Sequence, residues 1–280
     1  PYPRQDQARQ QDVEFISASE PQYTFSSPEC RHSTLYMEKR AVEGEPTVFS
    51  ETFEFTANGE WHNLKPEDVQ PYDTTTALYK EYTAEREKHI VFSPRLRELA
   101  AKLTAGENNP YLKAKRIFRW VNDNFPWASA REYSTIENIP EYVLDNRHGD
   151  CGQVSLLFIT LCRISGIPAH FQSGFMMHPR AWNLHDWAEV YFEGVGWVPA
   201  DQSFGIPAFA RNADEEYFFL GGIDSWRMIV NTDYGMPLQP EKQYPRSETV
   251  DFQRGEVEWE GGNLYFPQWD YHMDIDYLNY

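Results

Sequence analysis

The fold is constrained most by a long, largely apolar segment at residues 154–164. Asp150 precedes it, and an aspartate at this place caps a helix because its carboxylate accepts hydrogen bonds from the first N–H groups. Gly166 and Pro168 follow it and supply the signals that end a helix. The pattern therefore predicts a largely buried helix of about four turns that starts at Cys151.

Cys151 lies in the first turn of this predicted helix. A thiol attacks only as the thiolate, and a cysteine with an ordinary pKa of ~8.5 is mostly protonated at neutral pH. At a helix start, the unsatisfied N–H groups and the positive end of the helix dipole favour an anion. The same N–H groups can stabilise an oxyanion on an attacked carbonyl. We therefore expect Cys151 to be an activated nucleophile, whereas Cys162 is expected to be a buried structural residue.

A β-hairpin is predicted between His185 and Asp201, where two apolar strands flank the Gly-rich turn 193–196. If the reversal centres on Glu193, His185 lies directly opposite Asp201, and opposed side chains have Cβ atoms ~4.5–5.5 Å apart. The carboxylate would then hold the imidazole so that the other ring nitrogen takes the thiol proton. The inference depends on register, because a slip of one residue would put the pair on opposite faces.

Each of these residues also has a common structural interpretation. An isolated cysteine is most often a small buried residue, a histidine at a strand start is usually solvated, and an aspartate at a strand end usually caps a turn. The order Cys151, His185, Asp201, together with the Gly-Asp-Cys helix start, favours the catalytic interpretation. Asp186 is expected to point to the strand face opposite to that of His185.

Three other histidines compete for the role of base. His148 is close to Cys151 in sequence but has no obvious orienting carboxylate on a rigid element. His178 is expected in a loop. His170 is expected in a short strand, with a structural or surface role.

Four segments of the chain resemble the transglutaminase-like superfamily. They are Gly149-Asp150-Cys151-Gly152-Gln153, Gly166-Ile167-Pro168-Ala169, His185-Asp186-Trp187-Ala188-Glu189-Val190 and Gly196-Trp197-Val198-Pro199-Ala200-Asp201. The resemblance covers roughly residues 110–210. It implies an α+β fold with a papain-like, transglutaminase-like core, in which the nucleophile helix packs on an antiparallel sheet. It also implies a catalytic triad of Cys151, His185 and Asp201, and chemistry through a thioester on an amide or peptide.

The resemblance also implies an oxyanion donor, because related enzymes often use a side chain from the segment before the nucleophile helix. Trp127, Tyr133 and Gln153 are the candidates for oxyanion or substrate binding. For each aromatic residue, packing in the core is the favoured alternative. Gln153, in the first turn near Cys151, either polarises the substrate or caps a backbone group.

The rest of the chain predicts an N-terminal β-rich extension. Residues 33–39 and 48–56 alternate as half-buried strands do, and Asn58-Gly59 is a turn signal. We expect a β-rich segment or small domain at 1–75, a catalytic core at 76–235, and strands and loops packing on the core at 236–280. The sequence also predicts core helices that begin at Ser93-Pro94, ending at Leu103, and at Asn109-Pro110.

Composition limits the partners. The 280 residues hold 25 Lys and Arg against 43 Asp and Glu, a formal net charge of −18, which argues against nucleic acid or an anionic membrane as partner. A cationic peptide substrate would be attracted, although such a charge also serves solubility alone. The three cysteines include no CxxC pair, so no metal site, disulfide scaffold or cofactor is expected.

No stretch approaches the ~20 apolar residues that a membrane-spanning helix needs. The polar start, residues 1–7, is not a signal peptide and resembles a mature or trimmed N-terminus. We therefore expect an extracytoplasmic location, periplasmic or at the cell surface.

These observations favour a cysteine-dependent hydrolase, a peptidase or amidase that acts on an amide, peptide or protein substrate. Hydrolysis is the default because an amine-transfer enzyme needs a second substrate tunnel, and the sequence reveals none. The superfamily also contains protein cross-linkers, amidases that remove glycans from asparagine, and inactive scaffolds, so two alternatives stay open. They are a catalytically silent module that binds peptide or glycan, and an acyl-transfer cross-linker.

Overall fold

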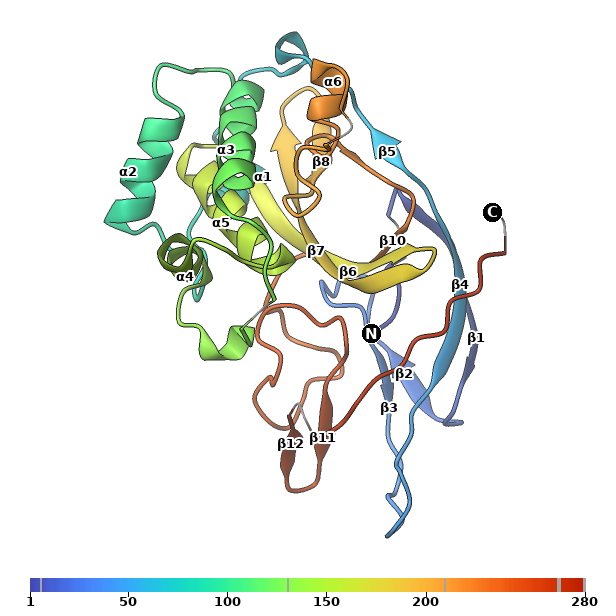
Figure 1. The fold of residues 1–280 in the computed structure, drawn as a ribbon. Helices are drawn as coiled ribbons and strands as arrows, with labels where there is room; N and C mark the ends of the chain where they lie inside the picture. Colours follow the sequence, from blue (N-terminus) through green and yellow to red (C-terminus); the bar gives the residue numbers. More distant parts are fainter. Residues whose placement is uncertain (6, 130, 209, 266–267, 279–280) are drawn as a thin grey trace. The chain divides into compact units, whose positions relative to one another are not determined.

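The computed structural model describes residues 1–280 except 6, 130, 209, 266–267 and 279–280 (Figure 1). It divides into two compact units. The β unit comprises residues 1–58, 173–184 and 226–280, and the helical unit comprises residues 59–172 and 185–225. Strands β6 (Ala169–His178) and β7 (Ala181–Phe192) contribute residues to both units. The three-part division expected above, at 1–75, 76–235 and 236–280, stays a prediction.

The helical unit is built around α5. Its helices are α1 (Ala77–Tyr82), α2 (Pro94–Leu103), α3 (Pro110–Asn124), α4 (Ile139–Asn146), α5 (Cys151–Ile164) and α6 (Ala213–Glu216), with 3-10 turns at Pro66–Asp68 and Tyr133–Thr135. Helices α2, α3 and α4 each pack against α5. Ser93 caps α2 and Asn109 caps α3, each followed by a proline, so the two helix starts predicted from sequence are confirmed.

Helix α5 is buried on every side from Gly152 to Arg163, as expected of a helix whose sequence is largely apolar. Cys162 is fully buried, which confirms its predicted structural place. Gly166 ends the segment with φ +75°, a left-handed conformation that glycine adopts without strain. The described residues hold no helix that is both long enough and apolar enough to cross a membrane.

The hairpin of β7 and β8 (Gly196–Ala200) has a different register from the predicted one. Ala188 faces Ala200 and Phe192 faces Gly196, so the reversal centres on residue 194 and not on Glu193. The same ladder, continued by one pair, would put Trp187 and not His185 across from Asp201. Moving the centre by one residue moves each partner by two, and residues two apart share a face of a strand. His185 and Asp201 therefore remain on one face despite the error in register.

The β unit contains β1 (Gln10–Ala18), β2 (Tyr23–Phe25), β3 (Leu35–Met37), β4 (Glu51–Ala57), β10 (Arg227–Asn231), β11 (Val257–Trp259) and β12 (Gly262–Leu264). The antiparallel pairs are β1 with β4, β2 with β3, β11 with β12, and β10 with residues 173–176 of β6. The strands predicted at 33–39 and 48–56 contain β3 and most of β4. Asn58-Gly59 makes no hairpin, because β5 (Glu60–Trp61) pairs with β9 (Gly222–Ile223) in the helical unit.

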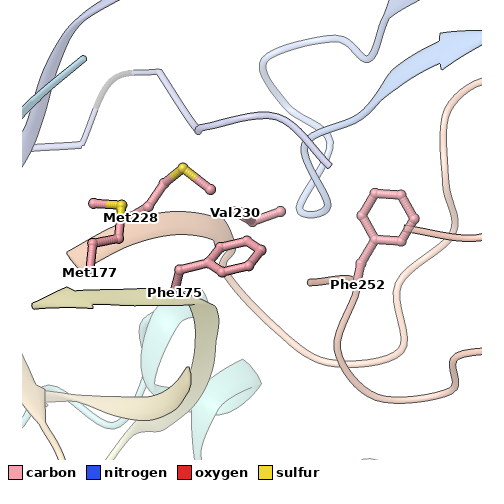
Figure 2. Packing of buried hydrophobic residues seen from close by; sticks show 5 residues of the cluster. All are labelled: Phe175, Met177, Met228, Val230 and Phe252. Carbon is pink, nitrogen blue, oxygen red and sulfur yellow. The ribbon is translucent and has the colours of Figure 1, made fainter. Parts of the chain in front are cut away.

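A small apolar core holds the paired strands of the β unit together. Figure 2 shows Met177 of β6 next to Met228 of β10, with Phe175, Val230 and Phe252 completing the cluster. The two strand backbones approach closely at Gly174, where a Cβ would lie 1.8 Å from a backbone oxygen of β10. The glycine is therefore required by the packing of β6 on β10.

Candidate active site

The start of α5 is fixed by a capping box. The Asp150 carboxylate accepts a hydrogen bond from the Gln153 backbone N–H at 3.0 Å, and the Gln153 side-chain oxygen accepts from the Asp150 backbone N–H at 3.3 Å. Of the two roles predicted for Gln153, the structure therefore places this side chain as a cap. The box sets the first turn, and Cys151 is its first residue.

Tyr133 is buried and its hydroxyl donates to the Asp150 carboxylate at 2.6 Å. Burial raises the pKa of Asp150 to about 6, against the opposing effect of this hydrogen bond. A Cβ on Gly152 would lie 2.4 Å from the Tyr133 hydroxyl and 2.7 Å from a carboxylate oxygen of Asp186. Gly152 thus lets two polar side chains approach the helix start, one from the preceding segment and one from β7.

His185 and Asp201 form a buried pair. His185 Nε2 lies 2.8 Å from Asp201 Oδ2, and the two side chains are 5% and 0% exposed. The other carboxylate oxygen of Asp201 accepts hydrogen bonds from the backbone N–H groups of Ser203 and Phe204, at 3.0 and 3.1 Å. The carboxylate is therefore rigidly held, and the imidazole is oriented through Nε2.

The thiol of Cys151 donates to Asp186. The distance from Sγ to Asp186 Oδ2 is 3.3 Å. This contact was not part of the expectation for Asp186, which was only that it lies on the strand face opposite to that of His185; it arises because the first turn of α5 lies against β7 at this residue. The sequence prediction for Asp186 used strand alternation alone. The sequence signal that could have indicated a place in the site was the position of Asp186 between His185 and Trp187 in one motif.

The surroundings of Cys151 oppose ionisation. Burial raises the pKa of the thiol well above its ordinary value, and the carboxylates of Asp186 and Asp150 raise it further, while a hydrogen bond from the Asp186 backbone N–H lowers it. Cys151 as a whole residue is partly exposed. The resting site thus holds a protonated thiol beside two carboxylates.

A chain of buried polar groups continues from His185 along the sheet. The Trp187 ring lies 5.8 Å from the His185 ring, between centroids, and its indole N–H donates to the Gln172 side-chain oxygen at 2.6 Å. The Gln172 amide donates to Glu189 at 3.1 Å, and His170 Nε2 lies 3.1 Å from the same carboxylate oxygen. His170 therefore has a structural place, as expected, and the chain fixes the tryptophan beside His185.

The remaining predicted residues are dispersed. Trp127 is 61% exposed, so core packing is wrong for this side chain, although its backbone forms a bridge with Gly149, two residues before Cys151. Tyr133 is buried, as the packing alternative proposed, but its hydroxyl also donates a hydrogen bond to Asp150.

His178 lies at the end of β6 and not in the expected loop. No group of three or more His, Cys, Asp and Glu side chains among the described residues could hold a metal ion.

Comparison with known proteins agrees with this core. Residues 97–202 match the family model of the transglutaminase-like superfamily. The matched segment includes Cys151, His185 and Asp201, so residues 97–202 are similar to that superfamily. The α+β fold expected from the sequence resemblance is therefore confirmed.

Individual relatives are more distant. The uncharacterized protein YebA of Bacillus subtilis (strain 168) is 27% identical over 140 residues, which are 43% of this chain and 19% of that protein. The chain thus spans only a small part of this relative. A candidate cysteine protease from Cytophaga hutchinsonii shares the fold with a TM-score of 0.56 at 18% identity, over 83% of this chain and 73% of that one. The periplasmic domain of TgpA from Pseudomonas aeruginosa gives a TM-score of 0.40 at 15% identity, over 73% of this chain and 75% of that one.

Proposed function

We propose that this protein is a cysteine-dependent hydrolase of amide or peptide bonds. Cys151 attacks the amide carbonyl, His185 takes the thiol proton and later gives it to the leaving amine, and Asp201 orients His185. Water then hydrolyses the thioester and releases the acid. The observation that carries the proposal is the buried His185–Asp201 pair at 2.8 Å, in which His185 lies on β7 directly before Asp186, the residue that contacts the thiol.

The hydrogen bond to Asp201 supports the assignment of His185 as base. A carboxylate beside Nε2 favours the tautomer that carries its proton on Nε2, so Nδ1 is the nitrogen that accepts a proton. When the imidazole becomes an imidazolium, the buried carboxylate stabilises the new charge. The capped start of α5 supplies N–H groups that favour an oxyanion near Cys151. Donation from the Trp127 indole to that oxyanion is part of the proposal.

The substrate is proposed to be a peptide, protein or peptide-like amide. The Cytophaga neighbour is described as a candidate cysteine protease, and we extend that class of reaction to this chain. An extracytoplasmic location also remains a proposal.

The experiment that tests the proposal compares wild type with Cys151→Ala on a mixed peptide library, with new N-termini detected by mass spectrometry. We expect cleavage by wild type and its loss, by about a thousandfold or more, in the variant. The matched control is Cys30→Ser, which changes a partly exposed cysteine of the β unit and should leave cleavage unchanged. Equal cleavage by wild type and Cys151→Ala would overturn the assignment of the nucleophile.

The hydrogen bond from the thiol to Asp186 favours one alternative, a silent binding module, because it holds the sulfur in its unreactive form. Such a module would bind peptides without cleaving any. An acyl-transfer enzyme would incorporate an added primary amine into a glutamine donor. The same library, assayed with and without the amine, separates all three outcomes.

A further inference from the structure

The proposed nucleophile lies in a negatively charged environment. Asp186 contacts the Cys151 sulfur at 3.3 Å, and the charge of Asp150, at the N-cap of the same helix, acts on the thiol in the same direction. A thiolate at this place would lie beside two carboxylates. Because Coulomb repulsion falls only as the inverse of distance, both charges disfavour thiolate formation.

The position of the Asp186 carboxylate is fixed by packing. Its residue is 1% exposed and follows His185 directly in β7. The carboxylate lies against the first turn of α5 at Gly152. A Cβ at this position would lie only 2.7 Å from Asp186 Oδ2, so the glycine leaves the space that the carboxylate occupies. Asp186 therefore cannot swing away from the sulfur without displacing this packing.

Cys151 is partly exposed as a residue, whereas Asp186 is buried. A group that contacts Cys151 therefore comes within the field of Asp186 without contact to its oxygen atoms. A cation there would be attracted by both carboxylates and would offset their effect on the thiolate. An anion would be repelled by the same charges.

We propose that Asp186 makes this site selective for amides that carry a positively charged group next to the scissile bond, such as a free amine on the acyl part. The inference rests on the proposed function and names the substrate class of that site. The bound cation favours the thiolate, so the substrate itself completes the activation of Cys151. The net charge of −18 draws a cationic substrate toward the protein from a distance.

The test uses charged thiol reagents and needs no known substrate. Aminoethyl methanethiosulfonate is a cation, methyl methanethiosulfonate is neutral, and sulfonatoethyl methanethiosulfonate is an anion. In each reaction the thiolate attacks the sulfenyl sulfur, a disulfide forms, methanesulfinate leaves, and the thiol proton passes to solvent. A Cys30→Ser background leaves Cys151 and the fully buried Cys162, and mass spectrometry identifies the labelled residue.

For each reagent we compare the rate of Cys151 labelling with the rate of its reaction with mercaptoethanol, a small reference thiol. After this normalisation, we expect the cationic reagent to label Cys151 about tenfold or more faster than the anionic reagent in the parent protein. Asp186→Asn, which keeps the shape of the side chain, should lower this ratio by about tenfold. Glu137→Gln removes one exposed carboxylate of the helical unit and should leave the ratio unchanged. Circular dichroism verifies the fold of each variant.

The inference is overturned if the parent protein shows no preference among the reagents, a result that needs no variant, or if Asp186→Asn keeps the full ratio. The failure of the proposed function is a separate result, because it appears as absence of peptide cleavage and leaves the labelling ratio unaffected. Where cleavage is found, free-amine peptides should exceed their acetylated counterparts in kcat/KM, and this preference should be lost in Asp186→Asn.

Discussion

Asp201 and Asp186 are two buried carboxylates of the candidate site, and each contacts one proposed catalytic group, with opposite consequences. Asp201 faces an imidazole and holds it at 2.8 Å through Nε2, so its carboxylate orients His185 and leaves Nδ1 free to accept a proton. Asp186 faces a thiol, whose charged form is an anion, so the same charge opposes ionisation of Cys151. One residue type thus prepares the base and restrains the nucleophile. Removing the charge of Asp201 should therefore lower the reactivity of the site, whereas removing the charge of Asp186 should raise the reactivity of the thiol.

The largest effect is expected from Asp201→Asn. The amide can still accept from the backbone N–H groups of Ser203 and Phe204, so the loop should be preserved. Its NH₂ group, however, would donate to His185 Nε2 and favour the tautomer with the proton on Nδ1, which cannot accept the thiol proton. We expect kcat for peptide cleavage to fall by about a thousandfold or more with KM little changed.

The control for this prediction is Glu137→Gln, which removes a carboxylate from an exposed position of the same unit. It should keep both kcat and KM. If Asp201→Asn retains the wild-type kcat while folded, His185 is not the base, and the comparison between the two carboxylates loses its first member.

Asp186→Asn should change reactivity in the opposite direction. Removing the carboxylate removes the repulsion on the thiolate, so the pKa of Cys151 should fall. A fall of one unit would speed alkylation by iodoacetamide near neutral pH by about tenfold. The measurement is the alkylation rate against pH in the Cys30→Ser background. An unchanged pH profile would show that Asp186 does not restrain the nucleophile.

Asp150 predicts a smaller effect on stability. Burial raises its pKa to about 6, above the ordinary value of an aspartate, so the folded state binds a proton more tightly than the unfolded chain. The stabilisation is complete below the unfolded pKa and is lost as the pH rises through about 6. Between pH ~5 and ~7 the free energy of unfolding should lose about 1 kcal/mol from this group.

Asp150→Asn isolates that contribution, because asparagine is also a good N-cap and does not titrate. Urea unfolding at the two pH values should show a smaller loss of stability in the variant than in wild type. The same pH dependence in both proteins would exclude Asp150 as its source.

The features that could be predicted from sequence are those set by short-range rules. The helix from Cys151 is fixed by its own cap, its apolar run and the glycine that ends it. The pairing of His185 with Asp201 was predicted from a wrong register and still holds, since the error moved the partner by two residues and kept the face. A prediction of which face a side chain lies on thus remains correct when the predicted partner is wrong by two residues.

The features that could not be predicted depend on how distant segments pack. Nothing in the order of residues shows that α5 begins against Asp186, because that contact joins positions 35 residues apart through the packing at Gly152. For Trp127, a candidate oxyanion donor, core packing is the favoured alternative from the sequence, whereas its side chain is mostly exposed. The charge around the nucleophile therefore became visible only in three dimensions.

The smallest effect is expected from Trp187→Phe, which tests how firmly the imidazole side of the site is held. Phenylalanine keeps an aromatic ring beside His185 but loses the indole N–H that donates to Gln172. Because a buried hydrogen bond contributes about 1 kcal/mol, we expect the free energy of unfolding to fall by that amount. With the ring less firmly fixed beside His185, kcat should fall by about threefold. The matched control is Trp182→Phe in the same strand, where the side chain is exposed, and it should change neither quantity. Equal effects of the two substitutions would mean that the buried chain from Trp187 to Glu189 does not position His185, and that Asp201 orients the base by itself.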